Sequence, residues 1–239
     1  MSLFPKNVKF LSTNRYIEGG NSSRGFENFN LAFHVDDCRE SVAANRELLQ
    51  DYYALPSEPV WLNQTHSSVC VNALSCEEIV AKADASFTSK LGVVCGILTA
   101  DCLPVFISKK DGSMVGVAHA GWKGMVSGVI ENLIRSFDCI GTDLVVHLGP
   151  AISMNSFEVG KEIKDMYLSK NKNFDRAFNF QNHKYYLDLY EAARVIFESF
   201  NVVSISGGDR CTFKESDHFF SYRRDGDKSG RMAHLIWMK

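Results

Sequence analysis

Long apolar stretches are missing from this sequence, and their absence argues against a membrane protein. Of the 239 residues 45% are hydrophobic, but no apolar run approaches the roughly 20 residues that a membrane helix needs. The first six residues also lack the extended apolar core of a signal peptide. We therefore expect a cytoplasmic protein that does not bind membranes.

An excess of charge of either sign is missing as well. Lysine and arginine number 26, aspartate and glutamate 28, and the formal net charge is −2 with acids and bases interspersed. Such a balance gives no electrostatic reason for binding nucleic acid or an anionic membrane. We expect neither as a partner, and the sequence does not define the oligomeric state.

Cysteine is present but shows no short-spaced framework. The seven cysteines are an odd number, scattered along the chain, and none forms the Cys-x-x-Cys spacing of a structural zinc finger. This pattern excludes a small disulfide-stapled scaffold and favours a reducing compartment. With 23% charged residues, the composition is that of a globular protein that buries a core without disulfides.

Internal repeats, low-complexity tracts and linkers are absent too. Apolar runs of strand length predict strands over residues 8–11, 60–62, 69–74, 144–148, 202–206 and 232–238. Helical periodicity predicts helices over residues 41–53, 125–137 and 157–170, and another that Asp188 opens. Residues 171–182 are polar and aromatic, and we expect them to form an excursion outside the regular helices and strands. The sequence therefore predicts one α/β (α+β) domain over residues 1–239.

The most informative stretch runs from residue 93 to residue 124. Apolar runs over residues 93–98 and 103–107 flank Cys102, and a return run over residues 114–118 leads to His119. Asp-Gly lies between the last two runs, which is a hairpin signal. A hairpin would bring Cys102 and His119 to the same end of a sheet. A thiolate and an imidazole at one place can hold a metal ion or act as nucleophile and base.

His66 extends this pair to a set of three. It ends another short apolar run, and with Cys102 and His119 it forms a His/Cys/His set. Two imidazoles and a thiolate are the number and kind of ligands in catalytic zinc sites that keep a fourth position open. Spacing alone leaves a second interpretation open, in which two core histidines lie beside a core cysteine.

Two aspartates near these runs have two interpretations each. Asp101 directly precedes Cys102, where it would either orient a ligand histidine or cap the turn. Asp84 would be either a turn residue or a site residue.

Arginines are candidates for binding an anion. Arg46 stands among apolar positions of the helix expected over residues 41–53, which Asp36 or Asp37 would cap. Its side chain would either lie along the core or face an anion. Near the C-terminus Arg223, Arg224 and Arg231 stand among aromatic and apolar residues, so we expect one of them to point inward toward a phosphate or carboxylate.

Three motifs carry a resemblance to a known family. NQTHS, TADCLPV and GVAHAGWKG contain His66, Cys102 and His119, and they stand in the order and at roughly the separation found in the laccase-domain family. This family is also called the multi-copper polyphenol oxidoreductase or YfiH-like family. Further ordered matches, such as Asn45-Arg46, Gly149-Pro150-Ala151-Ile152 and the run from Phe220 to Arg224, extend the likeness over nearly the whole chain.

The resemblance implies a fold, a metal site and an activity. The fold would be a mixed β-sheet sandwich covered by helices, similar to the YfiH proteins and the cytotoxic necrotizing factors. His66, Cys102 and His119 would bind zinc, and Cys102, His119, Asp84 and Asp101 would take part in catalysis. The activity would be cleavage of adenosine, inosine, guanosine or methylthioadenosine with phosphate as co-substrate, together with deamination of adenosine. Arg46 and Arg223 would neutralise the phosphate.

Three other functions stay open. The family's older label implies copper-dependent oxidation of polyphenols, but a multicopper array needs many more histidines than the seven of this chain, which show no His-x-His pairing. Zinc is therefore favoured over copper. A cysteine hydrolase of cell-wall precursors would use Cys102 as nucleophile and His119 as base. The last alternative is a metal-binding protein without catalytic activity.

Overall fold

Three β-sheets form the framework of the computed structural model, which describes residues 4–23, 25–73 and 80–239. The strands are β1 (Val8–Ser12), β2 (Cys70–Asn72), β3 (Ala85–Thr88), β4 (Cys95–Thr99), β5 (Leu103–Lys109), β6 (Val115–Ala120), β7 (Leu144–Leu148), β8 (Glu158–Val159), β9 (Phe178–Gln181), β10 (Lys184–Leu187), β11 (Ser204–Gly207) and β12 (Met232–Met238). The large sheet has the order β11-β7-β5-β6-β3-β2, the small sheet β1-β12-β4, and the hairpin sheet β8-β10-β9.

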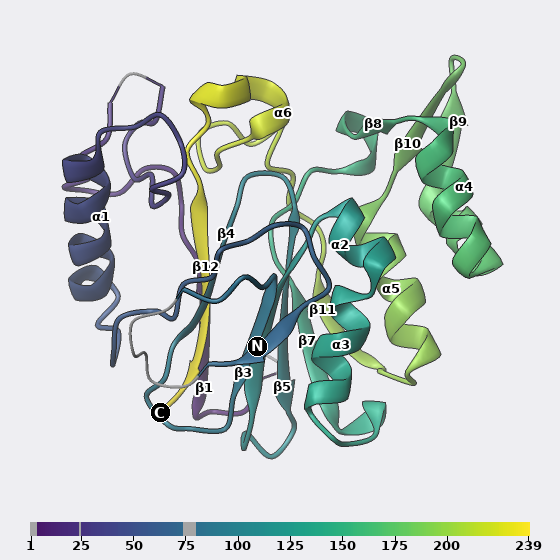
Figure 1. The fold of residues 1–239 in the computed structure, drawn as a ribbon, viewed down its shortest axis with the longest axis horizontal. Coiled ribbons are helices and arrows are strands. Elements are labelled where there is room, and N and C mark those ends of the chain that lie inside the picture. Colours follow the sequence, from purple (N-terminus) through teal and green to yellow (C-terminus); the bar gives the residue numbers. More distant parts are fainter. Residues whose placement is uncertain (1–3, 24, 74–79) are drawn as a thin grey trace.

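Helices cover both outer faces of the two central sheets (Figure 1). Helix α1 (Arg39–Tyr52) lies beside the small sheet, and α2 (Trp122–Ser127), α3 (Val129–Ser136) and α5 (Leu189–Ser199) lie beside the large one. The remaining helices are α4 (Lys161–Lys170), α6 (Tyr222–Asp225) and the 3-10 turns η1 (Gly141–Asp143), η2 (Met154–Ser156), η3 (Lys172–Ala177) and η4 (Gly226–Lys228). Within the described ranges, no helix combines the length and the apolar character needed to cross a lipid bilayer.

Side-chain alternation explains why the layers pack in this order. In β5, Val105 and Ile107 join the apolar cluster with α3 and α5, whereas Phe106 joins the cluster between the two central sheets. In β12, Ile236 joins the cluster between the sheets and Leu235 joins the cluster with α1. Successive strand residues point to opposite faces, so strands buried on both faces carry continuous apolar runs. The result is a mixed α/β sandwich, which confirms the predicted fold class.

The predicted hairpin is confirmed. Strands β5 and β6 pair antiparallel, with Pro104 opposite His119. The turn between them contains Asp111 and Gly112, and the φ of Gly112 is +73°, which glycine adopts without steric cost. The strand signals in this part of the chain were local, and the structure follows them closely.

The predicted helix over residues 125–137 is wrong in its continuity. The chain instead forms α2, which begins at Trp122, and α3, which begins at Val129. Between them Gly128 has a φ of +100°, a left-handed conformation that ends one helix before the next begins. The apolar periodicity runs through this break and therefore conceals it.

Two further boundaries differ for reasons of strand pairing. The helix predicted over residues 157–170 begins only at Lys161, because Glu158 and Val159 pair with β10. The excursion predicted over residues 171–182 contains η3 and β9, which pairs antiparallel with β10. Figure 1 shows this β9–β10 hairpin projecting beside α4.

Two other local predictions are also corrected. The strand expected over residues 60–62 makes only an isolated bridge, from Val60 to Cys95. Helix α1 is preceded by Cys38 and has no side-chain cap. The Asp37 carboxylate instead accepts hydrogen bonds from Oγ of Ser22 and Nδ2 of Asn30. Strand β2 lies inside the range predicted over residues 69–74, the last of which falls outside the described residues.

Candidate metal centre

The three predicted ligands meet at one end of the large sheet. His119 lies near the end of β6, Cys102 lies between β4 and β5, and His66 lies on the loop before β2. One ligand atom from each of them lies within 4.8 Å of the others. Sγ of Cys102 is 3.8 Å from Nε2 of His66, and the centroids of the two imidazole rings are 4.7 Å apart. The hairpin thus brings Cys102 and His119 together as predicted.

The 3.8 Å between Sγ of Cys102 and Nε2 of His66 is close to the spacing of two ligands on a first-row transition metal ion. Zinc binds imidazole nitrogen at about 2.0–2.1 Å and thiolate sulfur at about 2.3 Å in tetrahedral geometry, which places ligand atoms roughly 3.5 Å apart. His66 is exposed, Cys102 is half-buried and His119 is buried, so the open side of the three ligands faces solvent. Within the part of the chain that the structure describes, no other group of three His, Cys, Asp or Glu residues meets this spacing.

The carboxylate of Asp84 connects two of the ligands. It is 0% exposed, and its Oδ1 accepts hydrogen bonds from Nδ1 of His119 at 2.8 Å and from the backbone N–H of His66 at 3.0 Å. Its Oδ2 accepts from the backbone N–H of Ser67 at 2.6 Å and from the Ser67 hydroxyl at 2.7 Å. Because Nδ1 of His119 is held by this carboxylate, its Nε2 is the nitrogen that faces Cys102 and would bind a metal.

Asp84, Cys102 and His119 shift one another's pKa values in the direction that favours their charged forms. Burial alone would raise the pKa of Asp84, but the hydrogen bonds from His119 and Ser67 lower it to about 2. Burial would likewise raise the pKa of Cys102, but His119 and His66 lower it below its ordinary value. The pKa of His119 rises, because the charges and hydrogen bonds of Cys102 and Asp84 outweigh burial. The thiolate is therefore favoured, and it is the form that binds a metal or attacks an electrophile.

Left-handed backbone flanks two of the three ligand positions. The φ angle is +59° at His66 and +93° at Asp101. Such conformations cost of the order of 1–3 kcal/mol at residues other than glycine, and they gather at functional sites. At Asp101 two hydrogen bonds offset the cost, from Oγ1 of Thr212 at 2.6 Å and from the backbone N–H of Arg223 at 2.7 Å. The structure shows no contact of the Asp101 carboxylate with a ligand histidine, and Asp84 makes that contact instead.

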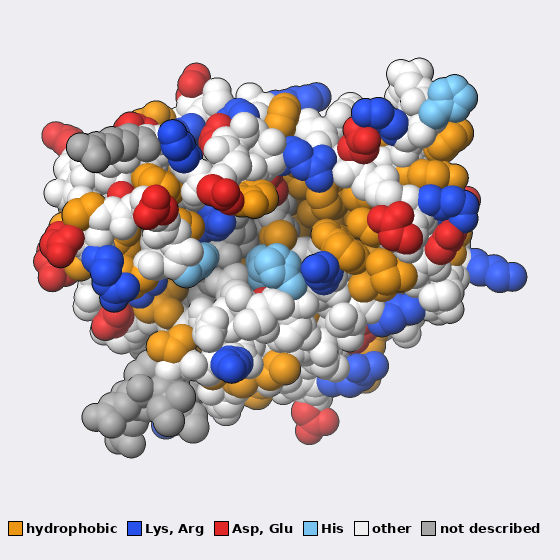
Figure 2. Space-filling model, turned by 45° about the horizontal axis from the view of Figure 1, so that its top comes forward, with side chains coloured by type: hydrophobic (Ala, Val, Ile, Leu, Met, Phe, Trp, Pro, Cys, Tyr) orange, Lys and Arg blue, Asp and Glu red, His pale blue; other side chains and the backbone are white. Residues whose placement is uncertain are grey.

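A cavity of about 490 Å³ opens over the three ligands, a size typical of small-molecule sites. Figure 2 shows the hollow on this face, with histidine, basic and hydrophobic side chains around it. Beside the ligands, the lining contains the apolar and aromatic residues Leu98, Trp122, Ile152, Phe157, Leu189 and Tyr222. Its cationic residues are Arg223 and Arg231. The cavity therefore offers a flat apolar surface and positive charge in one space.

Arg46, predicted to face an anion, is not among the residues that line this cavity. Its Nε donates to the carbonyl oxygen of Leu31 at 3.0 Å, and its guanidinium carbon lies 4.4 Å from the ring centroids of Phe33 and Trp61. The structure thus favours the interpretation in which the Arg46 side chain packs along the core. Arg223, the other predicted phosphate ligand, does line the cavity, and its binding of phosphate stays a prediction.

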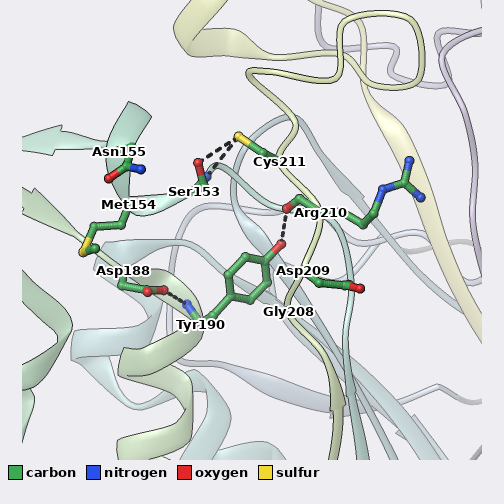
Figure 3. A pocket seen from close by; sticks show the side chains of 9 residues that line it. All are labelled: Ser153, Met154, Asn155, Asp188, Tyr190, Gly208, Asp209, Arg210 and Cys211. Carbon is green, nitrogen blue, oxygen red and sulfur yellow. Dashed lines mark hydrogen bonds between the residues drawn. The ribbon is translucent and has the colours of Figure 1, made fainter.

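A second and smaller cavity, of about 270 Å³, surrounds Cys211 (Figure 3). Sγ of Cys211 accepts hydrogen bonds from Oγ of Ser153 at 3.0 Å and from its backbone N–H at 3.4 Å. The Tyr190 hydroxyl donates to the carbonyl oxygen of Arg210 at 2.6 Å. No histidine lines this cavity, so its thiol lacks the imidazole partners that Cys102 has.

Together the layers and the ligands define a mixed α/β sandwich protein with a candidate His/Cys/His metal centre at the bottom of a cavity. A family model described as multi-copper polyphenol oxidoreductase laccase matches residues 10–239. The chain therefore belongs to this family.

Relatives and solved structures agree with this assignment. The Escherichia coli (strain K12) protein named purine nucleoside phosphorylase YfiH is 39% identical over 234 residues, which cover 98% of this chain and 95% of that protein. A Haemophilus influenzae protein named purine nucleoside phosphorylase is 37% identical over 238 residues, covering 98% and 96%. The crystal structure of a Neisseria meningitidis protein is similar with a TM-score of 0.94 at 41% identity, and the match covers 100% of this chain and 97% of that one.

Proposed function

We propose that the protein is a purine nucleoside phosphorylase that uses zinc held by His66, Cys102 and His119. One observation carries the proposal: the ligand set lies in a cavity whose lining combines aromatic rings with arginines. A purine base stacks on flat apolar surfaces, whereas phosphate needs positive charge. The names of the Escherichia coli and Haemophilus influenzae relatives support the same activity.

The reaction breaks the bond between C1′ of the ribose and the purine nitrogen and forms a bond from C1′ to a phosphate oxygen. The purine leaves with the electron pair and takes up a proton. His66, Cys102 and His119 would hold the zinc ion, which would supply Lewis-acid chemistry at the open side of the site. Asp84 holds His119 and the loop of His66 in place by hydrogen bonds, and the arginines of the lining neutralise phosphate. The wall of the cavity keeps the positively charged ribose of the transition state near phosphate oxygens.

The proposal extends to several purine nucleosides and to a second reaction. We include adenosine, inosine, guanosine and methylthioadenosine as substrates, because the apolar lining does not by itself select one purine. We also include deamination of adenosine, in which water adds to the purine ring carbon and ammonia leaves; zinc held by His66, Cys102 and His119 would supply the Lewis acid for that chemistry. Release of ammonia from adenosine in phosphate-free buffer separates this activity from phosphorolysis.

Oxidation of polyphenols is the second candidate, and the description of the family favours it. A laccase holds a His₂Cys copper centre together with further copper ions on many histidines. Only one qualifying ligand group occurs among the residues that the structure describes. Zinc-dependent nucleoside chemistry therefore fits the donor set better than a multicopper array.

The test combines metal content with turnover. Protein purified without added metal is analysed by mass spectrometry for metals, and release of base from adenosine and inosine is followed with and without phosphate. About one zinc per chain and phosphate-dependent release support the proposal. Several coppers per chain with oxidation of phenols would establish the oxidase instead. A metal-free protein inactivated by alkylation of Cys102 would establish the cysteine hydrolase.

A further inference from the structure

The side chain of Arg231 faces the metal centre from the residue that precedes β12. It lines the same cavity as Cys102 and His119. Burial lowers the pKa of Arg231, and the charges of Cys102 and Asp101 oppose that change, which places its guanidinium within electrostatic reach of the centre. An arginine remains charged at neutral pH in such a place. A desolvated positive charge that faces a cavity favours an anion there.

The hydrogen bonds of Arg231 leave one edge of its guanidinium free. Nη1 donates to the carbonyl oxygens of Ser229 at 2.5 Å and Gly230 at 3.0 Å. Neither Nε nor Nη2 donates a hydrogen bond to any residue that the structure describes. These two nitrogens form one edge of the planar group, and their N–H bonds point in parallel. Two parallel donors match two oxygens of a phosphate or carboxylate.

The other arginines near the cavity are more fully engaged. Nη1 and Nη2 of Arg223 donate to the carbonyl oxygens of Ser156 at 3.4 Å and Glu158 at 3.1 Å. The guanidinium of Arg223 also lies 5.1 Å from the ring centroid of Phe157. Nε of Arg224 donates to the Asp225 carboxylate, and its Nη1 and Nη2 donate to backbone carbonyl oxygens. Arg231 is thus the arginine of this cluster that keeps a free pair of donors.

We propose that Arg231 binds the phosphate co-substrate through Nε and Nη2, beside the open side of the His66, Cys102 and His119 centre. This inference rests on the proposed function and assigns to Arg231 the role that the sequence suggested for Arg46 and Arg223. Phosphate held there lies between the guanidinium and the metal ligands. The rings of Phe157 and Tyr222 remain for the purine, and the Tyr222 ring centroid is 5.7 Å from the Arg231 guanidinium carbon.

The test measures phosphate and nucleoside separately in the zinc-loaded enzyme. Arg231→Gln and Arg231→Lys are compared with the wild type by steady-state kinetics and by calorimetric titration with inorganic phosphate. For Arg231→Gln we expect the Kd and KM for phosphate to rise about 10- to 100-fold, because two charge-assisted hydrogen bonds are lost. The KM for inosine should change by less than about threefold. Arg231→Lys keeps the charge but not the fork, so it should recover only part of the loss.

A matched control and a rival variant sharpen the result. Arg135→Gln changes an arginine on α3 whose Nη1 donates to Asn132 on the protein surface, and it should leave the phosphate Kd unchanged. Arg223→Gln tests the competing assignment. An unchanged phosphate Kd in Arg231→Gln, or a loss confined to Arg223→Gln, would overturn the inference. If Arg231→Gln fails to fold by circular dichroism, the comparison rests on Arg231→Lys, and wild-type affinity in that variant would overturn the paired-donor contact.

The same measurements distinguish phosphate binding by Arg231 from the phosphorylase activity. Binding of phosphate that depends on Arg231, without release of base from any purine nucleoside, would support the anion site and refute the phosphorylase. Phosphorolysis with a phosphate KM that is indifferent to Arg231 would do the reverse.

Discussion

Two buried histidines, one in each of the two central sheets, have pKa values that are shifted in opposite directions. His119 on β6 and His234 on β12 are 4% and 0% exposed. His119 lies two positions from Val117 in β6, and His234 lies two positions from Ile236 in β12. Side chains two positions apart in a strand point to the same face. Because Val117 and Ile236 belong to the apolar cluster between the two central sheets, both histidines point into that layer. Residue type, burial and layer are therefore shared by the two histidines.

Their hydrogen-bond partners account for the difference. His119 faces the carboxylate of Asp84 and the thiol of Cys102, and its pKa is raised. Among the described residues, His234 forms hydrogen bonds only with hydroxyl groups, Oγ of Ser12 and Oγ1 of Thr99, each at 2.8 Å. Burial and then the charge of His119 lower the pKa of His234 to about 3. The pKa of a buried imidazole therefore rises or falls according to whether an anion lies beside it.

The largest expected effect comes from removing the first histidine. His119→Ala deletes a metal ligand and leaves two, so we expect metal content to fall from about one ion per chain to near zero. Phosphate-dependent release of base should fall to the uncatalysed background. Mass spectrometry of metals and a base-release assay measure both quantities. The control is His183→Ala, an exposed histidine in the β9–β10 turn, and equal losses in the two variants would contradict the assignment.

His234 should make the free energy of unfolding depend on pH. Its pKa is about 6.5 when unfolded and about 3 when folded, so the unfolded chain binds more protons between these values. The contribution of His234 is therefore complete above about pH 6.5 and is lost as the pH falls toward 3. The free energy of unfolding should fall by about 1.4 kcal/mol per pH unit from this group.

Urea unfolding at several pH values between 7.5 and 4.5 measures this slope, in the wild type and in His234→Gln. Other groups contribute equally to both proteins and cancel in the difference. We expect the curve of the variant to be flatter by about the stated slope. Parallel curves would show that His234 is protonated in the folded protein.

The anion beside His119 is tested by Asp84→Asn. This change keeps the size of the side chain but removes the charge that holds His119 and the backbone N–H of His66. We expect metal affinity to fall about 10- to 100-fold, as for other carboxylate partners of ligand histidines. Competition with a chromophoric chelator measures it. Asp111→Asn, in the exposed β5–β6 turn, is the control and should keep the affinity of the wild type.

The smallest effect is expected from the hydroxyl partners of His234. Ser12→Ala removes the hydrogen bond to Nδ1 and should lower the free energy of unfolding by about 1 kcal/mol. Metal content should not change, because Ser12 contacts no ligand. Loss of metal in this variant would mean that the two histidine environments are coupled, and the contrast between them would fail.

Local signals in the sequence predicted the parts of the fold that depend on neighbours along the chain. The apolar runs around Asp111 and Gly112 predicted the hairpin that joins Cys102 to His119, and the structure confirms it. The break between α2 and α3 was missed because apolar positions keep their period across it. Gly128 was the available signal, since glycine is the usual residue for a left-handed helix end.

The parts that sequence reasoning could not settle depend on distant residues. Local sequence alone slightly favoured a turn residue at Asp84, and only the family resemblance made it a site residue, because its partners are the backbone N–H groups of residues 65–67 and the ring of His119. Arg46 was predicted to bind phosphate, whereas Arg231 was only one of three arginines near the C-terminus of which one was expected to point inward. Their roles separate only when Phe33 and Trp61 are found on either side of Arg46 and the cavity is found beside Arg231.

The position of Asp84 also bears on the order in which the protein folds. Its carbonyl oxygen accepts the backbone N–H of His119 at 2.7 Å, directly before β3 pairs with β6. The ligands come from three separate segments, and closing the loops between them costs chain entropy that only the completed sheet repays. We therefore expect binding of a metal at this centre to be a late step in folding, so that a metal-release signal would time the opening of the β3–β6 ladder during unfolding.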